Sequence, residues 1–319
     1  MTGFNEFLVV VGAMFLLLAI GFVTRKTGVI DDASSNRLSA LIIKLAQPTL
    51  IVSSLIGAER STENLILGGK MLLIGVLLHC FMALIAYFSC KGFKDFDERK
   101  ISEFSMIFGN CGFLGFPIFE ALFPDKGLFL GAFLVISFHL VLWTWGIAIL
   151  GRKRPDIKLT VKKIFINLGT VPSAIGLALY LALLPFPELS YPEFLVKACN
   201  YVGSLCTPIS MLITGALIAT KPIKEFLTSG KLYYVSILKL LVIPLVVCTV
   251  MAILGFDDDM VKFCTIAAAL PTASTASMLG ELHNISPSYA SQAVGFSTLV
   301  SLATMPCVML IAPVIIEHL

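Results

Sequence analysis

Residues 108–117 read Phe-Gly-Asn-Cys-Gly-Phe-Leu-Gly-Phe-Pro, an apolar stretch that three glycines, an asparagine and a proline interrupt. In a helix interior a glycine costs about 1 kcal/mol and a proline about 3 kcal/mol relative to alanine. A continuous helix is therefore not expected here. Residues 270–277 read Leu-Pro-Thr-Ala-Ser-Thr-Ala-Ser and form a second break, because Pro271 lacks an N–H and four hydroxyl residues follow it. The sequence thus predicts two broken helices far apart in the chain.

The composition around these breaks is typical of a membrane protein. Of the 319 residues, 57% are apolar and 13% are charged, and the mean hydropathy is +0.94. A soluble domain carries about 25% charged residues, so the apolar excess is expected to face lipid. The net charge of +3, without a basic run on a polar face, indicates no nucleic-acid partner. The eight cysteines include no CxxC pair, so neither a disulfide framework nor a metal site is expected.

Ten apolar stretches approach the length of about 20 residues that crosses the hydrocarbon core of a bilayer. They cover residues 5–24, 38–58, 70–90, 101–122, 127–150, 164–185, 197–219, 231–255, 260–281 and 289–316. The two breaks lie in the fourth and the ninth of these spans. No positively charged segment precedes the first apolar run, so we interpret that run as an uncleaved first span.

The lysines and arginines of the short loops predict the orientation of the chain. Alternate loops place sixteen of them on one side of the membrane and five on the other, while Lys44 and Lys239 lie inside spans. Because cytoplasmic loops carry the excess of basic residues, the first side is assigned to the cytoplasm. We therefore expect a multi-pass protein of the cell membrane with both termini on the extracytoplasmic side.

The two halves of the chain repeat with an offset of 160 residues. Leu45-Ala-Gln-Pro48 in the second span, for example, corresponds to Leu205-Cys-Thr-Pro208 in the seventh. Each half holds five spans, an odd number, so the second half begins on the opposite side of the membrane as an inverted-topology repeat. We predict an all-α fold of ten transmembrane helices, in which helices 4 and 9 are broken and cross. The first repeat covers residues 1–151, a basic cytoplasmic linker 152–163 and the second repeat 164–319.

Each break predicts part of a binding site. Unpaired backbone at membrane depth is tolerated only where protein or a water-filled cavity covers it. A half-helix N-terminus offers free N–H groups and a positive dipole, which suit an anion. Two breaks in corresponding positions therefore point to one central cavity for a small anion, the alternative being proline kinks filled by neighbouring helices. The candidate substrate-binding residues are Asn110, Gly112, Pro117, Pro271, Thr272, Ser274, Thr275 and Lys239.

Lys239 and His79 are ionisable residues deep inside the eighth and third spans, and the repeat relates one to the other. A lysine near the bilayer centre costs about 2.5–3.5 kcal/mol on insertion scales, which favours a functional role. We expect Lys239 to offset the negative charge of the substrate and His79 to change protonation during transport. The alternatives are a Lys239 side chain that snorkels to the interface and a His79 that packs in the core. For His139, packing is the favoured interpretation.

Three motifs resemble the auxin efflux carrier family in its short bacterial form, and the similarity covers essentially the whole chain. They are Gly109-Asn-Cys-Gly-Phe-Leu-Gly-Phe-Pro117, Leu270-Pro-Thr-Ala-Ser-Thr-Ala276 and Lys239-Leu-Leu-Val-Ile-Pro244. The resemblance implies the crossed-helix fold shared with bile-acid symporters and sodium–proton antiporters, with crossover prolines at Pro117 and Pro271 and Asn110 beside the first. It implies a scaffold of spans 1, 2, 6 and 7, a moving transport domain of spans 3–5 and 8–10, a homodimer and elevator-type alternating access. Relatives are linked to dicarboxylates such as malate and malonate.

These features favour a secondary transporter of a small organic anion, a carboxylate or dicarboxylate, with Na⁺ or H⁺ as the coupling ion. No cofactor is expected, and the partners are the carboxylate, the lipid bilayer and a second copy of the chain. An enzyme is not expected because no span holds an acidic pair, and the sequence has no nucleotide-binding loop for an ATP-driven pump. The alternative function is a membrane sensor that binds a carboxylate without moving it.

Overall fold

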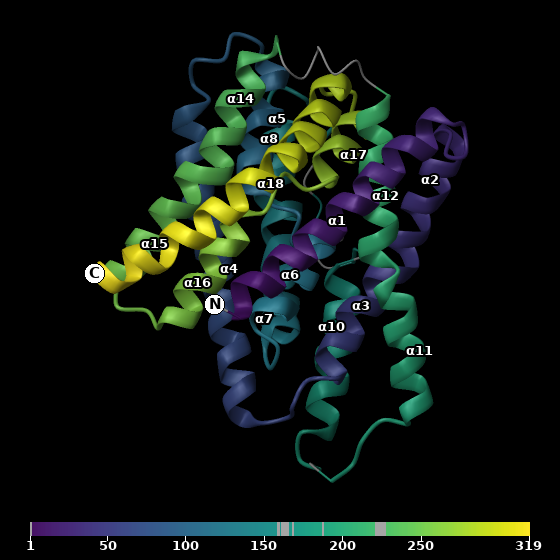
Figure 1. Cartoon of the computed structure of the whole chain (residues 1–319), viewed down its shortest axis with the longest axis vertical. Helices are drawn as coiled ribbons and strands as arrows, with labels where there is room; N and C mark the ends of the chain where they lie inside the picture. The colour runs from purple at the N-terminus through teal and green to yellow at the C-terminus, as the bar shows by residue number, and fades with distance from the viewer. Residues whose placement is uncertain (1, 158–159, 161–165, 168, 187, 221–227) are drawn as a thin grey trace. The chain divides into compact units, whose positions relative to one another are not determined.

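The computed structural model describes residues 2–157, 160, 166–167, 169–186, 188–220 and 228–319, and every named element among them is a helix (Figure 1). Seven helical segments among these residues are long and apolar enough to cross a membrane, and two shorter apolar segments are Cys111–Leu122 and Thr170–Leu183. The seven are Phe4–Lys26, Asp32–Ile56, Thr62–Ser89, Gly127–Gly151, Glu193–Ala219, Gly230–Ile253 and Pro287–His318. The prediction of an all-α membrane protein is confirmed, whereas the inverted repeat of ten spans stays a prediction.

The fourth and ninth spans are each divided into two helices. The fourth consists of α5 (Phe96–Ile107) and α6 (Phe116–Leu122), and the ninth of α16 (Asp258–Ala269) and α17 (Thr275–Leu282). Helix α5 begins five residues before the predicted span because the Asp95 carboxylate accepts hydrogen bonds from the first backbone N–H groups. The two breaks expected from glycine and proline are therefore present.

The predicted sixth span and the predicted linker are described only in part. Helix α10 (Thr170–Leu183) lies within the sixth span, 164–185, of which residues 164, 165 and 168 are outside the described residues. Residues 158–159 and 161–163 of the linker are also outside them.

Helix starts in the second half recur near the predicted offset. Helix α7 (Gly127–Val141) begins at residue 127 and α18 (Pro287–His318) at residue 287. Helix α6 begins at residue 116 and α17 at residue 275. These two pairs of helix starts lie 160 and 159 residues apart, and the repeat itself stays a prediction.

Two compact units make up the chain, and each draws on both halves of the sequence. The first unit comprises Met1–Val76, Gly112–Thr144 and Leu159–Ala216. The second unit comprises Leu77–Cys111, Trp145–Lys158 and Leu217–Leu319. Helix α4 (Thr62–Ser89) contributes to both units.

In the first unit, α1 (Thr2–Lys26) packs against α12 (Cys206–Ala219) through glycines. A Cβ atom at Gly21 would lie 2.1 Å from the carbonyl oxygen of Leu212, and one at Gly215 would lie 2.0 Å from that of Leu18. No side chain larger than hydrogen fits at either position, so the two helices meet backbone to backbone, as small residues permit in membrane bundles.

The remaining helices of the first unit include α2 (Asp32–Leu41), α3 (Gln47–Ile56) and α11 (Glu193–Ser204). Helices α10 and α11 both lie beside α3 (Figure 1).

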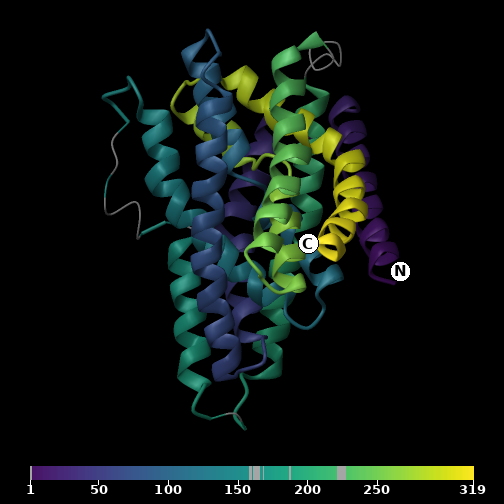
Figure 2. The same cartoon turned by 90° about the vertical axis from the view of Figure 1, so that its left-hand side faces the viewer.

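The second unit contains both sides of the second break and one side of the first. Its helices are the end of α4, α5, α8 (Ile147–Gly151), α14 (Gly230–Ile237), α15 (Ile243–Ile253), α16, α17 and α18. Helices α14 and α15, joined by a π turn, form one continuous helical segment, and α16 lies beside α15 (Figure 2).

Four π-helical turns occur among the described residues, at Ile42–Ala46 (η1), Cys111–Gly115 (η2), Leu142–Gly146 (η3) and Leu238–Val242 (η4). Three of them directly precede a helix whose second residue is a proline, namely Pro48, Pro117 or Pro244. A proline has no N–H to donate, and its ring crowds the carbonyl four residues before it. The wider π turn accommodates the ring, and such turns are frequent at functional sites.

Candidate functional site

The two breaks meet each other inside the second unit. The backbone N–H of Asn110 donates to the carbonyl oxygen of Pro271 at 2.7 Å, and that of Ala273 donates to the carbonyl oxygen of Phe108 at 2.9 Å. Gly109 and Thr272 face each other in this short antiparallel bridge. Backbone groups that the breaks remove from the helices thus find partners in the opposite break, as buried backbone requires.

Local sequence explains why the backbones come so close. A Cβ atom at Gly109 would lie 3.2 Å from the Cβ of Leu270, tighter than ordinary contact. Thr272 anchors the other strand of the bridge: its N–H donates to Ser297 Oγ at 3.1 Å, and its hydroxyl donates to the Ser105 carbonyl at 3.4 Å. The backbone N–H and the hydroxyl of Thr272, a predicted substrate contact, therefore both donate within the protein.

Two hydroxyl groups beside the crossing are buried and have no hydrogen-bond partner among the described residues. They are Ser105 Oγ, in the last turn of α5, and Thr275 Oγ1, on the first residue of α17. A buried polar group without a partner costs about 1–3 kcal/mol. Thr275 was predicted as a site residue. Ser105 was missed, and its position near the end of a helix that leads into a break is the signal that identifies it.

Lys239 lies in the π turn η4 with no part of its surface exposed. Its Nζ contacts Met82 Sδ at 3.8 Å and forms no ion pair with a described carboxylate. Complete burial does not fit a side chain that snorkels to the interface, and it places an amino group in the same unit as the crossing.

His79 is also buried and lies against the first break. Its ring centroid is 6.0 Å from that of Phe108, which in turn contacts Phe104 at 4.5 Å. His79 is 4% exposed. The aromatic contact links the predicted titrating residue to the backbone of the crossing.

The other predicted site residues are placed as follows. Asn110 is buried and Ser274 is half-buried, and both belong to the second unit. Gly112 and Pro117 belong to the first unit, where a Cβ atom at Gly112 would lie 2.9 Å from Gln47 Nε2. The carbonyl of Phe113, four residues before Pro117, accepts a hydrogen bond from the Thr207 hydroxyl at 3.1 Å.

Buried ion pairs hold the N-terminal end of α5. Glu103 is 2% exposed and pairs with Arg99, at 2.8 Å, and with Arg152. Lys100 is 1% exposed and pairs with Asp97 at 3.0 Å. The predicted loop before the fourth span, residues 91–100, includes Arg99 and Lys100, but both lie in the capped helix α5 and form ion pairs.

In the first unit, His139 is 7% exposed, and neither ring nitrogen has a hydrogen-bond partner among the described residues. A Cβ atom at Gly169 would lie 1.9 Å from the Cδ2 atom of His139, so the imidazole ring fills the space beside the glycine. This tight fit supports the packing role favoured from the sequence.

The sequence matches that of the membrane transport protein family over residues 8–309. The chain belongs to this family. The match spans nearly the whole chain, as expected from the motifs that resemble auxin efflux carriers. This membrane transport protein is accordingly a multi-pass membrane protein and not an enzyme.

Curated relatives of this membrane transport protein are also named as transporters. An uncharacterized transporter of Methanocaldococcus jannaschii is 23% identical over 300 residues, which cover 92% of this chain and 94% of the relative. One of Methanothermobacter thermautotrophicus is 22% identical over 297 residues, with coverage of 92% and 94%. The uncharacterized transporter YfdV of Escherichia coli is 19% identical over 307 residues, with coverage of 92% and 93%.

Proposed function

We propose that this membrane transport protein moves a small organic anion, a carboxylate or dicarboxylate such as malate or malonate, as a secondary active transporter. The observation that carries the proposal is the hydrogen-bonded crossing of the two breaks, with unpartnered hydroxyl groups and a buried lysine in the same unit. A half-helix N-terminus, hydroxyl donors and an amino group are together suited to a carboxylate.

The charge of Lys239 supports an anionic ligand. An isolated ammonium in a low-dielectric interior is costly unless a negative partner is present. Since no described carboxylate pairs with Lys239, a bound carboxylate would supply that partner. His79, held near the crossing by Phe108, is our candidate for proton coupling, with Na⁺ as the other candidate ion.

The transport step is proposed to be elevator-type alternating access in a homodimer, with both termini extracytoplasmic. In support, the crossing ties α5, α16 and α17 together within one unit, so that these helices can move as a rigid body. The chain passes from one unit to the other inside η2 and η3, where π turns are frequent at functional sites, and also inside α4 and α12.

Uptake into proteoliposomes tests the proposal. We expect radiolabelled malate or malonate to accumulate in vesicles that contain the protein, and the unlabelled acid to compete, whereas its uncharged diester does not. Binding without flux, under a sodium gradient and under a proton gradient, would instead identify the protein as a sensor. Equal competition by the diester would contradict the anion site.

The unpartnered hydroxyl of Thr275 gives a sharper prediction. Thr275→Val keeps the shape of the side chain and removes a hydroxyl that has no hydrogen-bond partner among the described residues, so stability is expected to be unchanged. If this hydroxyl donates to the substrate, its loss is expected to raise the KM for uptake by about 5- to 30-fold.

Thr265→Val is the matched control for this variant. Its hydroxyl is buried on neighbouring α16 and donates to the Val261 carbonyl at 2.7 Å. We expect this control to leave the KM unchanged. If both variants have the same KM, the Thr275 hydroxyl does not contact the substrate.

A further inference from the structure

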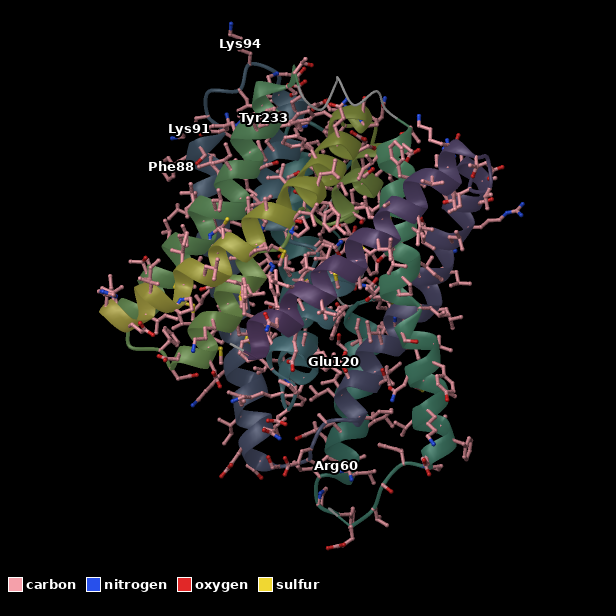
Figure 3. The ribbon with its side chains drawn as sticks, viewed as in Figure 1. Arg60, Phe88, Lys91, Lys94, Glu120 and Tyr233 are labelled. Atoms are coloured by element: carbon pink, nitrogen blue, oxygen red, sulfur yellow. The ribbon has the colours of Figure 1, made fainter. Side chains whose placement is uncertain are left out.

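The C-terminal end of α4 carries exposed aromatic rings together with lysines. We define the α4 patch as Tyr87, Phe88, Lys91, Lys94 and Tyr234. Phe88 is 57% exposed, Tyr87 43% and Tyr234 44%, and both lysines are exposed. Figure 3 shows Phe88, Lys91 and Lys94 in one corner of the molecule. The patch lies wholly within the second unit.

The rings of the α4 patch hold one of the lysines in place. Lys91 Nζ lies 4.4 Å from the ring centroid of Phe88 and 5.1 Å from that of Tyr87. The hydroxyl of Tyr234, from α14, donates to the carbonyl oxygen of Ser89 at 3.1 Å. A cation over aromatic faces is stabilised by their quadrupoles. The patch is therefore an organised surface and not a set of independent side chains.

Most other cations around the patch are already neutralised by carboxylates. Lys231 pairs with Glu98, while Lys100 and Arg154 pair with Asp97 at 3.0 and 3.1 Å. Burial alone would raise the pKa of Asp97, but the hydrogen bonds from these two residues outweigh it and lower that pKa. Asp97 thus stays ionised as their partner.

Lys91 and Lys94 differ from these cations, because neither has an acidic partner among the described residues. The neighbouring carboxylate of Asp95 accepts the backbone N–H groups of Asp97 and Glu98, both at 2.9 Å, as the cap of α5. Lys91 therefore stands over exposed rings without an acidic partner, and Lys94 follows it three residues later, close to where a 28-residue apolar helix ends.

We propose that the α4 patch binds the headgroup of an anionic phospholipid. Tyrosine and similar rings concentrate at the membrane–water interface, where one side of the ring is apolar and its edge is polar. Basic residues at that depth attract anionic headgroups. The rings of Tyr87 and Phe88 would lie along the upper acyl chain while Lys91 and Lys94 contact the phosphate. A lipid accounts for both parts of the surface, whereas a soluble phosphate would contact only the lysines.

Lipid binding to the purified full chain tests the proposal. In zwitterionic nanodiscs titrated with phosphatidylglycerol, thermal unfolding or native mass spectrometry reports the apparent lipid affinity. We expect Lys91→Ala/Lys94→Ala to weaken it by about 25-fold, since each lysine near a headgroup contributes about 5-fold. Tyr87→Leu, which keeps the apolar surface but removes the ring face, is expected to weaken it by a smaller factor, about 3-fold.

Arg37→Ala/Lys70→Ala is the matched control, because it removes two exposed positive charges outside the patch. It is expected to keep the wild-type affinity. The same loss in the control and in the patch variant would overturn the proposal, because general charge attraction would then explain binding. So would equal stabilisation of the wild type by inorganic phosphate, or no preference for phosphatidylglycerol. None of these outcomes depends on whether the protein transports a carboxylate.

Discussion

Replacing Lys239 with methionine is expected to lower carboxylate uptake, measured at substrate concentrations below KM, by about 10- to 150-fold while leaving the melting temperature unchanged or higher. The amino group is completely buried, and among the described residues its one hydrogen-bond contact is with the sulfur of Met82. Losing a charge-assisted contact to the substrate costs about 1.5–3 kcal/mol, or roughly 10- to 150-fold in affinity. Methionine preserves the length of the side chain and removes a buried charge, so the empty protein is not expected to lose stability.

Lys44→Met is the matched control for Lys239→Met. Lys44 also lies in a π turn that precedes a proline, but its side chain is exposed. Uptake by this control is expected to match that of the wild type. Measured on both proteins at equal amounts in the vesicles, unchanged uptake by Lys239→Met would remove the lysine from the mechanism. A lower melting temperature would assign it a structural role.

Local chemistry explains why the breaks themselves could be predicted. Glycine and proline disturb the helix in their own turn. An interrupted helix can therefore be predicted at residues 108–117 and at the segment that begins at Leu270 without information about the residues that pack against them. The alternation of basic and apolar stretches likewise predicts the long helices, because each needs only its own length and composition to be identified.

The contacts of the crossing depend on residues far apart in the chain. Nothing in the sequence around Asn110 indicates that its N–H pairs with the carbonyl of Pro271, or that Ser297 accepts the N–H of Thr272. For the same reason the sequence does not show that the Ser105 hydroxyl lacks a hydrogen-bond partner in the described part of the chain, although its place at the end of α5 marks it as a candidate. Long-range pairing is decided by packing, which a single sequence with periodic apolar stretches does not specify.

Charged residues near helix ends were the other source of error. A count of lysines and arginines assumes that such residues lie in loops, yet Arg99 and Lys100 lie in α5 and are paired with Glu103 and Asp97. Acidic residues three or four positions away on a helix offer such pairs, and this spacing was the available signal. Without these two positions the predicted split of basic residues between the two sides is fourteen to five.

Replacing Gly21 with valine is expected to destabilise the first unit by about 3 kcal/mol, near the upper end for an overpacked site. The new Cβ would lie 2.1 Å from the carbonyl oxygen of Leu212, a backbone atom that cannot rotate away. We expect the melting temperature in detergent to fall by roughly 5 °C or more. Gly12→Val is the control on the same helix, since a Cβ atom there would meet nothing within 4 Å.

The clash at Gly21 also predicts which second change fails to restore stability. Leu212→Ala shortens the facing side chain but leaves its carbonyl oxygen in place, so the double variant is expected to melt no higher than Gly21→Val alone. Recovery in the double variant would mean that side chains, and not the backbones, limit the approach of α1 to α12. Equal melting temperatures for Gly21→Val and Gly12→Val would contradict the close approach itself, because only the first position faces the neighbouring helix at backbone distance.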